Sequence, residues 1–249
     1  MRFGEGTESG TGSGGESRGE SRGGSGAGSG IDGGIGTAQR VASSLRDRIA
    51  EGGLKPGEQL PEAALAQAYG VSRNTVREAF RLLVHERLVV HEFNRGVFVR
   101  VPGPADIVDI YAVRFALETA GVRAAGPASP RLVADVLRAV EDGERAAAAG
   151  DWPRVADAGI HFHRALAALA GSPRTDSYMS AILAELRLVF QAMPSPAHLH
   201  EPFVGRNRVI ADLVRSGELG AAEAELKSYL ADSRQLILDT LNTQAEVRA

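Results

Sequence analysis

The chain has 249 residues, of which 43% are apolar and 24% charged, enough to fold one large domain or two ordinary ones. It contains no cysteine, which excludes disulfides, thiolate zinc sites and a cysteine nucleophile. No apolar run approaches the roughly 18 residues of a membrane span, and the first residues lack the apolar stretch of a signal peptide. We therefore expect a cytoplasmic protein without a membrane partner.

Positive charge is concentrated in one part of the sequence. The whole chain carries −3, but residues 37–101 hold ten Arg and Lys against seven Asp and Glu, a net +3 that leaves −6 on the remainder. A basic segment on an acidic body suits a protein that presents one end to phosphate. The overall negative charge therefore does not exclude a nucleic-acid binder.

The basic segment is predicted to begin with a helix. Residues 1–36 are mostly Gly, Ser and Glu and are predicted to form a disordered tail. Apolar residues then recur at helical spacing at Val41, Leu45 and Ile49, and Gly52-Gly53 ends the helix.

A helix-turn-helix with a wing is predicted to follow. A short helix over residues 62–68, a tight turn and a second helix over residues 72–85 fit this motif. Two strands at residues 88–92 and 97–100 flank a hairpin tip. We therefore expect a winged helix-turn-helix DNA-binding domain over residues 37–101. The inward face of its second helix is predicted to comprise Val76, Phe80, Leu83 and Val84.

Beyond a linker at residues 102–106, residues 107–245 are predicted to be helical throughout. Asp or Ser at helix starts, Pro in first turns and Gly after last turns delimit the elements. The expected helices cover about residues 106–125, 130–150, 152–171, 173–193, 203–215 and 219–241. The predicted fold class is mainly α, with an N-terminal winged helix-turn-helix and a C-terminal all-α bundle of six or seven helices.

Candidate DNA contacts gather at the start of the second helix of the motif. Ser72 can cap this helix, which leaves backbone amides and the positive end of the dipole facing phosphate. Arg73 and Arg77 share one face, and arginine can bind guanine through two hydrogen bonds. The remaining candidates are Asn74 and Thr75 beside them, and Arg95 and Gly96 at the hairpin.

Several spaced motifs here resemble the DNA-binding signature of the GntR family. They are Leu54-Lys55-Pro56-Gly57, Gly70-Val71-Ser72-Arg73-Asn74-Thr75-Val76-Arg77 and Arg95-Gly96-Val97-Phe98-Val99. The resemblance implies a transcriptional regulator whose Arg73 and Arg77 contact DNA, assisted by Asn74, Thr75 and the Gly96 wing. Ala63 departs from the pattern, because some relatives carry a DNA-contacting arginine there.

The helical part resembles the FCD effector domain of the FadR subfamily, on Phe162-His163-Arg164-Ala165-Leu166 and Ala170-Gly171-Ser172-Pro173-Arg174. Many such domains hold a divalent metal with an Asp and three His. The spacing places those ligands at Gly159, His163, Asn207 and Tyr229, of which only His163 matches. We therefore predict no metal and no other cofactor. His161 faces away from His163, and His198 and His200 are expected in a proline-rich loop.

Polar residues at inward positions of these helices predict a small-molecule site. Burying them is costly unless they have partners, and a ligand cavity with Arg114 clamping a carboxylate or phosphate would supply a reason. A salt bridge from Arg114 to Glu118 is the alternative, as is a hydrogen-bonded core position for His163. The candidate effector-binding residues are Arg114, His163, Arg187, Asn207 and Tyr229.

Together the patterns predict an effector-responsive, sequence-specific DNA-binding repressor rather than an enzyme. A homodimer would place two heads on a pseudo-palindromic operator in double-stranded DNA. A small effector, such as a carboxylic acid, would change their disposition. Two alternatives stay open: a constitutive DNA binder without a ligand, and an enzyme with His163 as general base near Tyr229. The enzyme is disfavoured because the bundle offers no paired inward carboxylates.

Overall fold

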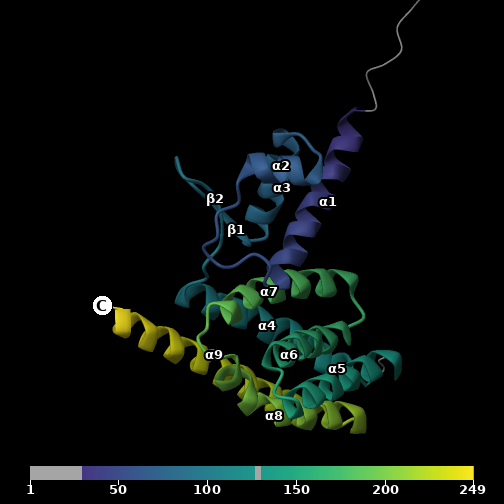
Figure 1. The fold of residues 1–249 in the computed structure, drawn as a ribbon. Coiled ribbons are helices and arrows are strands. Elements are labelled where there is room, and N and C mark those ends of the chain that lie inside the picture. Colours follow the sequence, from purple (N-terminus) through teal and green to yellow (C-terminus); the bar gives the residue numbers. More distant parts are fainter. Residues whose placement is uncertain (1–29, 127–129, 249) are drawn as a thin grey trace, which may run out of the picture.

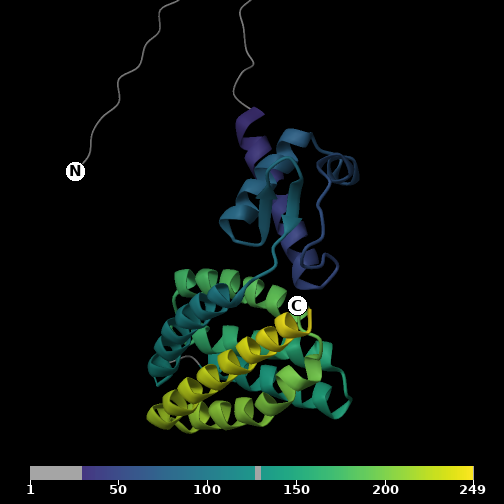
Figure 2. The same cartoon turned by 90° about the vertical axis from the view of Figure 1, so that its left-hand side faces the viewer.

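The computed structural model describes residues 30–126 and 130–248, and within them the fold is mainly α, as predicted. Figures 1 and 2 show a small head standing on one side of a helical bundle. The head comprises α1 (Gly30–Ala50), α2 (Glu62–Tyr69), α3 (Arg73–His85), β1 (Val89–Glu92) and β2 (Gly96–Val99). The bundle comprises α4 (Pro104–Ala124), α5 (Pro130–Ala148), α6 (Trp152–Ala168), α7 (Pro173–Gln191), α8 (Pro196–Ser216) and α9 (Leu219–Arg248).

The head is a helical core closed by the predicted hairpin. Strands β1 and β2 pair antiparallel, with Val89 opposite Val99, and the apolar stripe of α1 packs against α3 in one buried cluster. The prediction that Val84 faces inward is wrong, because its exposed fraction is 44%, whereas Ala79 is fully buried. The core of the head packs against the face of α3 that carries Ala79 and Leu83. Val84 lies about 100° around the helix from Leu83 and therefore faces away from this core.

Two helices begin earlier than the sequence predicts. Helix α1 starts at Gly30, within the segment expected as a tail, while residues 1–29 lie outside the described residues. The expectation of a loop around His198 and His200 is wrong, because α8 already begins at Pro196. The Ser195 side chain accepts a hydrogen bond from the His198 amide at 3.3 Å, and Pro196 occupies the first helical position. A capping serine followed by proline starts a helix here.

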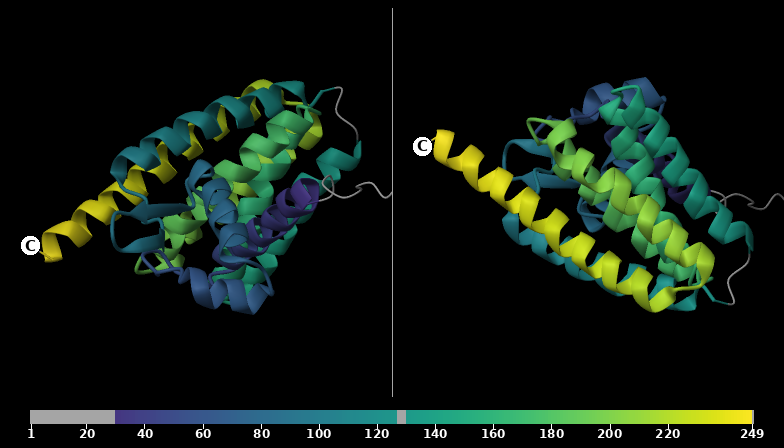
Figure 3. Two further views of the ribbon diagram at one scale, coloured as in Figure 1. Left: turned by 90° about the horizontal axis from the view of Figure 1, so that it is seen from above. Right: turned by 90° about the horizontal axis from the view of Figure 1, so that it is seen from below.

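Helix α4 crosses α6 at very short range. A Cβ added at Gly121 would lie 2.0 Å from the carbonyl oxygen of Leu166, so only glycine permits this crossing. The crossing brings Glu118 of α4 beside His163 of α6. Figure 3 shows that α9 runs alongside α4 and extends past the rest of the bundle. No helix within residues 30–126 and 130–248 is long and apolar enough to span a membrane.

Helix α7 belongs to both parts of the molecule. Leu188 is fully buried in the hydrophobic cluster of the head, whereas Leu186 and Val189 are buried in the cluster of the bundle. Two further side chains of α7 donate hydrogen bonds of 2.7 Å to carbonyl oxygens at the end of α1: Arg187 Nε to Ala50 and Gln191 Nε2 to Ile49. The Ala50 carbonyl is one of the acceptors that a helix end leaves free, whereas the Ile49 carbonyl also accepts from the Gly52 amide at 3.1 Å.

Candidate functional site

The start of α3 is exposed and built as the sequence predicts. Ser72 is the N-cap, and its Oγ accepts a hydrogen bond from the Thr75 amide at 3.1 Å. The hydroxyls of Ser72 and Thr75 lie 2.8 Å apart, so Thr75 reinforces the cap. Arg73 and Asn74 are exposed, and neither side chain has a hydrogen-bond or ion-pair partner among the described residues. They are therefore free to meet an external anion or base edge.

Arg77 lies one turn further along α3 and has a partner. Its Nε donates to Glu62 Oε2 at 2.9 Å, and the arginine side chain remains 57% exposed. An ion pair this exposed contributes about 0–1 kcal/mol. Glu62 therefore orients Arg77 without preventing its transfer to a phosphate or a guanine.

The wing tip is shaped by left-handed backbone at Asn94 and Gly96, whose φ angles are 58° and 106°. Gln59 Nε2 donates to the Arg95 carbonyl at 2.7 Å, which ties the tip to the segment before α2. The Arg95 guanidinium pairs with Glu92. Phe93, which the sequence did not single out, is 86% exposed at this tip. An apolar ring so exposed suits contact with a surface outside the chain.

In the bundle, four buried side chains form one polar cluster. Arg114 Nε donates to Glu118 Oε1 at 2.9 Å, and Glu118 Oε2 lies 2.7 Å from His163 Nδ1. His163 Nε2 lies 3.1 Å from the Tyr229 hydroxyl. Three of the five predicted effector-binding residues therefore meet here, and Glu118, foreseen only as an alternative partner of Arg114, joins them.

Electrostatics fix the protonation of this cluster. Burial alone would raise the pKa of Glu118, but His163 and Arg114 hold it below its ordinary value, so Glu118 is a carboxylate that only accepts. Burial lowers the pKa of His163, so its ring is neutral near pH 7. The histidine proton must then lie on Nδ1, facing Glu118. Burial also raises the pKa of Tyr229, which stays protonated and donates to His163 Nε2.

A small cavity adjoins the cluster. The space open to the centre of a water molecule is about 20 Å³, and Arg114, His163 and Tyr229 are among its lining residues. Arg114 Nη2 is buried and has no hydrogen-bond partner, which is costly for a guanidinium and favours an anionic occupant. Gly159 also lines the cavity, and a Cβ at that position would meet nothing within 4 Å.

The cluster does not fit the divalent metal held by many FCD domains. Both ring nitrogens of His163 are engaged in hydrogen bonds, Gly159 has no side chain, and Asn207 does not line the cavity. Within the described residues, no three His, Cys, Asp or Glu side chains converge as metal ligands. We therefore derive no chemistry through a metal in this protein.

The other two predicted effector residues lie elsewhere. Arg187 faces the junction between head and bundle, where it caps α1 and pairs with Asp157. Asn207 has a buried Oδ1 without a partner, away from the cavity. Conversely, His200 lines the cavity although its position was expected in a loop. The apolar neighbours Leu199 and Phe203 give this segment a helical period that would have revealed it.

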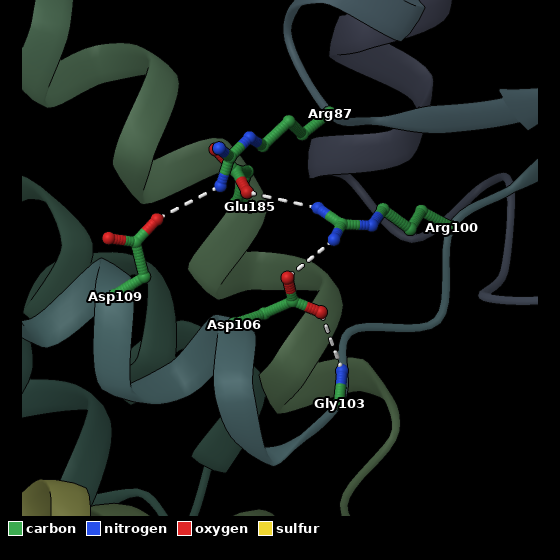
Figure 4. A network of polar contacts seen from close by, with 6 residues as sticks. All are labelled: Arg87, Arg100, Gly103, Asp106, Asp109 and Glu185. Atoms are coloured by element: carbon green, nitrogen blue, oxygen red, sulfur yellow. Dashed lines mark hydrogen bonds and ion pairs between the residues drawn. The ribbon is translucent and has the colours of Figure 1, made fainter.

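Sequence reasoning also missed a charged network where the head meets the bundle (Figure 4). Arg100, after β2, reaches Asp106 of α4 and Glu185 of α7, the latter at 3.4 Å. Asp106 Oδ2 accepts a hydrogen bond from the Gly103 amide at 2.9 Å, so Asp106 caps α4 from within its first turn. Helix α4 therefore begins at Pro104, inside the predicted linker. Burial raises the pKa of Glu185 to about 7 against the opposing effect of Arg87 and Arg100.

These features define a two-domain DNA-binding regulator with a winged helix-turn-helix head and a helical domain. Residues 37–99 match the family model described as bacterial regulatory proteins, gntR family, and residues 109–232 match the FCD domain. The chain belongs to the GntR family and carries a C-terminal FCD domain. The sequence-based identification is therefore confirmed.

Solved structures and curated relatives also point to a transcriptional regulator. A putative transcriptional regulator GntR from Rhodococcus sp. RHA1 is 42% identical, covers 82% of this chain and 98% of that chain, and has a TM-score of 0.75. The probable D-xylose utilization operon transcriptional repressor of Paenarthrobacter nicotinovorans is 29% identical over 78% of this chain and 88% of its own. The galactonate operon transcriptional repressor of Escherichia coli K12 is 26% identical over 80% and 96%.

Proposed function

We propose that this GntR-family regulator is a repressor that binds a pseudo-palindromic operator as a homodimer and responds to a small carboxylic acid. The observation that carries the DNA-binding part is the exposed start of α3, where Arg73 and Asn74 have no partner among the described residues. A capped helix N-terminus with free arginine and asparagine suits both phosphate and base contacts.

The homodimer is supported by an exposed apolar stripe on α4. Val108, Ala112 and Phe115 recur at helical spacing and are all exposed, with fractions of 47% for Val108 and 42% for Phe115. An apolar stripe of this kind suits a second copy related by a two-fold axis. Two heads held in this way would meet two half-sites of an operator.

The acidic effector is supported by the cavity at Arg114. Its unpartnered Nη2 favours a carboxylate over a neutral ligand. Relatives include repressors of the galactonate operon, over 80% of this chain, and of the gluconate operon, over 42% of this chain. Their names point to sugar acids, which suit the same chemistry.

DNA binding is tested by fluorescence anisotropy with a labelled duplex from the intergenic region beside the protein's own gene. Each arginine contact to a base is worth about 1–3 kcal/mol, so an Arg73→Ala/Arg77→Ala variant should bind at least about 30-fold more weakly. The matched control is Arg138→Ala/Arg145→Ala, which removes the same charge from exposed positions on α5. Equal affinity of wild type and the α3 variant would sink the assignment of α3.

A constitutive DNA binder is the second candidate, favoured by the small volume of the cavity. Thermal-shift measurements with a panel of organic acids separate the two candidates. Stabilisation by one acid that disappears in Arg114→Gln supports the sensor. A flat response across the panel supports the constitutive binder.

A further inference from the structure

The cavity at Arg114 adjoins a much larger groove. At about 20 Å³ the cavity has room for one water molecule, whereas pockets for small molecules span roughly 300–1,000 Å³. A groove of about 740 Å³ lies between head and bundle, lined by residues of α1, α6, α7 and α8. The same four residues, Ala156, Ile160, Phe190 and His200, line both spaces.

Part of the shared wall is a contact between two rings. The rings of Phe190 and His200 meet edge to face, with centroids 4.8 Å apart and planes at 88°. Both side chains are only half-buried, and no hydrogen bond to the His200 ring exists within the described residues. Rotation of these two side chains, which only packing holds in place, would join the cavity to the groove.

We propose that the effector occupies both spaces, with its carboxylate at Arg114 in the cavity and its body in the groove, passing between Phe190 and His200. This inference rests on the proposed function, in which the helical domain binds an acid. It extends that function by naming the route of entry and a second set of contacts.

The unpaired polar groups of the two spaces define the ligand. In the cavity, Arg114 Nη2 lacks an acceptor, and a carboxylate is the strongest one that a ligand can supply. In the groove, Gln191 Oε1 is buried without a partner, although its Nε2 donates to Ile49, so this oxygen requires a donor. A molecule with a carboxylate at one end and hydroxyl donors along its body satisfies both. The ligand class is therefore a hydroxylated carboxylic acid.

The residues of the wall do not repel an anion. Burial, assisted by the nearby charge of Arg187, lowers the pKa of His200 to about 4. His200 is thus neutral near pH 7. A carboxylate passing this wall meets no ionised acid among the residues shared by the two spaces.

Occupancy of the groove would reach the DNA-binding head directly. Gln191 and Arg187 line the groove and also hold the last carbonyls of α1. A ligand hydroxyl bonded to Gln191 acts on the side chain that positions Ile49. A ligand that contacts α1 differently in two arrangements of the head shifts the equilibrium between those arrangements.

The test is calorimetric titration of the full chain with hydroxy acids and their unhydroxylated counterparts. D-gluconate is compared with hexanoate, and glycerate with propanoate. At least one hydroxy acid should bind at least 10-fold more tightly than its counterpart. Gln191→Met should remove this preference while leaving the weaker affinity of the counterpart unchanged. The matched control is Gln235→Met on the exposed side of α9, which should preserve the preference.

The inner space is tested through Gly159, where a side chain meets open space. Gly159→Leu should fill the cavity and weaken binding of the preferred acid at least 10-fold in a protein that circular dichroism shows to be folded. Retained binding in Gly159→Leu, or an unchanged preference in Gln191→Met, would overturn the two-space site while leaving an acid sensor. A protein that binds the operator but none of the four acids refutes the site and the acid sensor together.

Discussion

The head and the bundle place their functional groups in opposite ways. In the head, Arg73 and Asn74 project from a finished helix and support nothing else in the fold. In the bundle, Arg114, Glu118 and His163 are each other's partners and are almost completely buried. Changing these residues in the head should therefore alter function without altering stability, whereas changing them in the bundle should alter both. Four changes test this contrast.

The largest effect is expected at Glu118. Glu118→Ala leaves the buried Arg114 charge without its partner, and breaking a buried pair on one side typically costs 3–5 kcal/mol. Urea unfolding followed by circular dichroism should show a loss of this size. The double variant Arg114→Met/Glu118→Leu removes both charges and should recover most of the loss. If Glu118→Ala were as stable as wild type, the bundle would tolerate loss of a site residue, as we expect of the head, and the contrast would fail.

A smaller effect is expected where α4 crosses α6. Gly121→Ala places a methyl group against the Leu166 carbonyl and should cost about 1–3 kcal/mol in urea unfolding as the helices separate. Gly159→Ala is the matched control, because it adds the same methyl group in a helix where nothing lies within 4 Å. It should instead stabilise the protein by about 0.5–1 kcal/mol. Equal effects at both positions would contradict the close crossing.

The junction should give stability a pH dependence. The pKa of Glu185 is about 7 in the folded protein, above its ordinary value of 4.5, so the folded state disfavours the ionised carboxyl. Stability should therefore fall as pH rises from 4.5 to about 7 and level off above, by on the order of 1–3 kcal/mol. Glu185→Gln should remove this fall in urea unfolding across the same range, whereas Asp142→Asn, on the exposed part of α5, should retain it. A fall that persists unchanged in Glu185→Gln must arise from another group.

The smallest stability effect is expected at the start of α3. Arg73→Ala/Arg77→Ala removes one unpaired arginine and one exposed ion pair, so the free energy of unfolding should change by less than about 0.5 kcal/mol. The same variant is expected to lose most of its affinity for DNA. A large loss of stability would instead show that these arginines support the fold of the head, as the buried polar cluster supports the bundle.

Much of the fold could be predicted because its signals are local. The caps at Ser72 and Asp151 and the turn at Gly70 can be recognised within a few residues, and the helices begin or end close to them. The start of α8 was missed because prolines usually indicate a loop, although Pro196 follows a capping serine.

The candidate site could be predicted only in part. Helical periodicity correctly turned Arg114, His163 and Tyr229 inward, and the Arg114–Glu118 spacing offered their ion pair as the alternative to a ligand clamp. Periodicity gives the buried face of a helix but not the neighbour that it meets. The junction around Arg187 and Glu185 depends on how head and bundle dock, which no local pattern encodes.

Leu188 has a consequence for the independence of the two domains. This residue of α7 fills part of the core of the head, although it lies almost ninety positions beyond the end of β2. A fragment cut after residue 101 would lose that side chain and expose the apolar surface it covers, with an expected cost of about 2–5 kcal/mol for a core leucine. We therefore expect the two family domains to unfold together rather than separately. The stability of the head depends in part on the bundle.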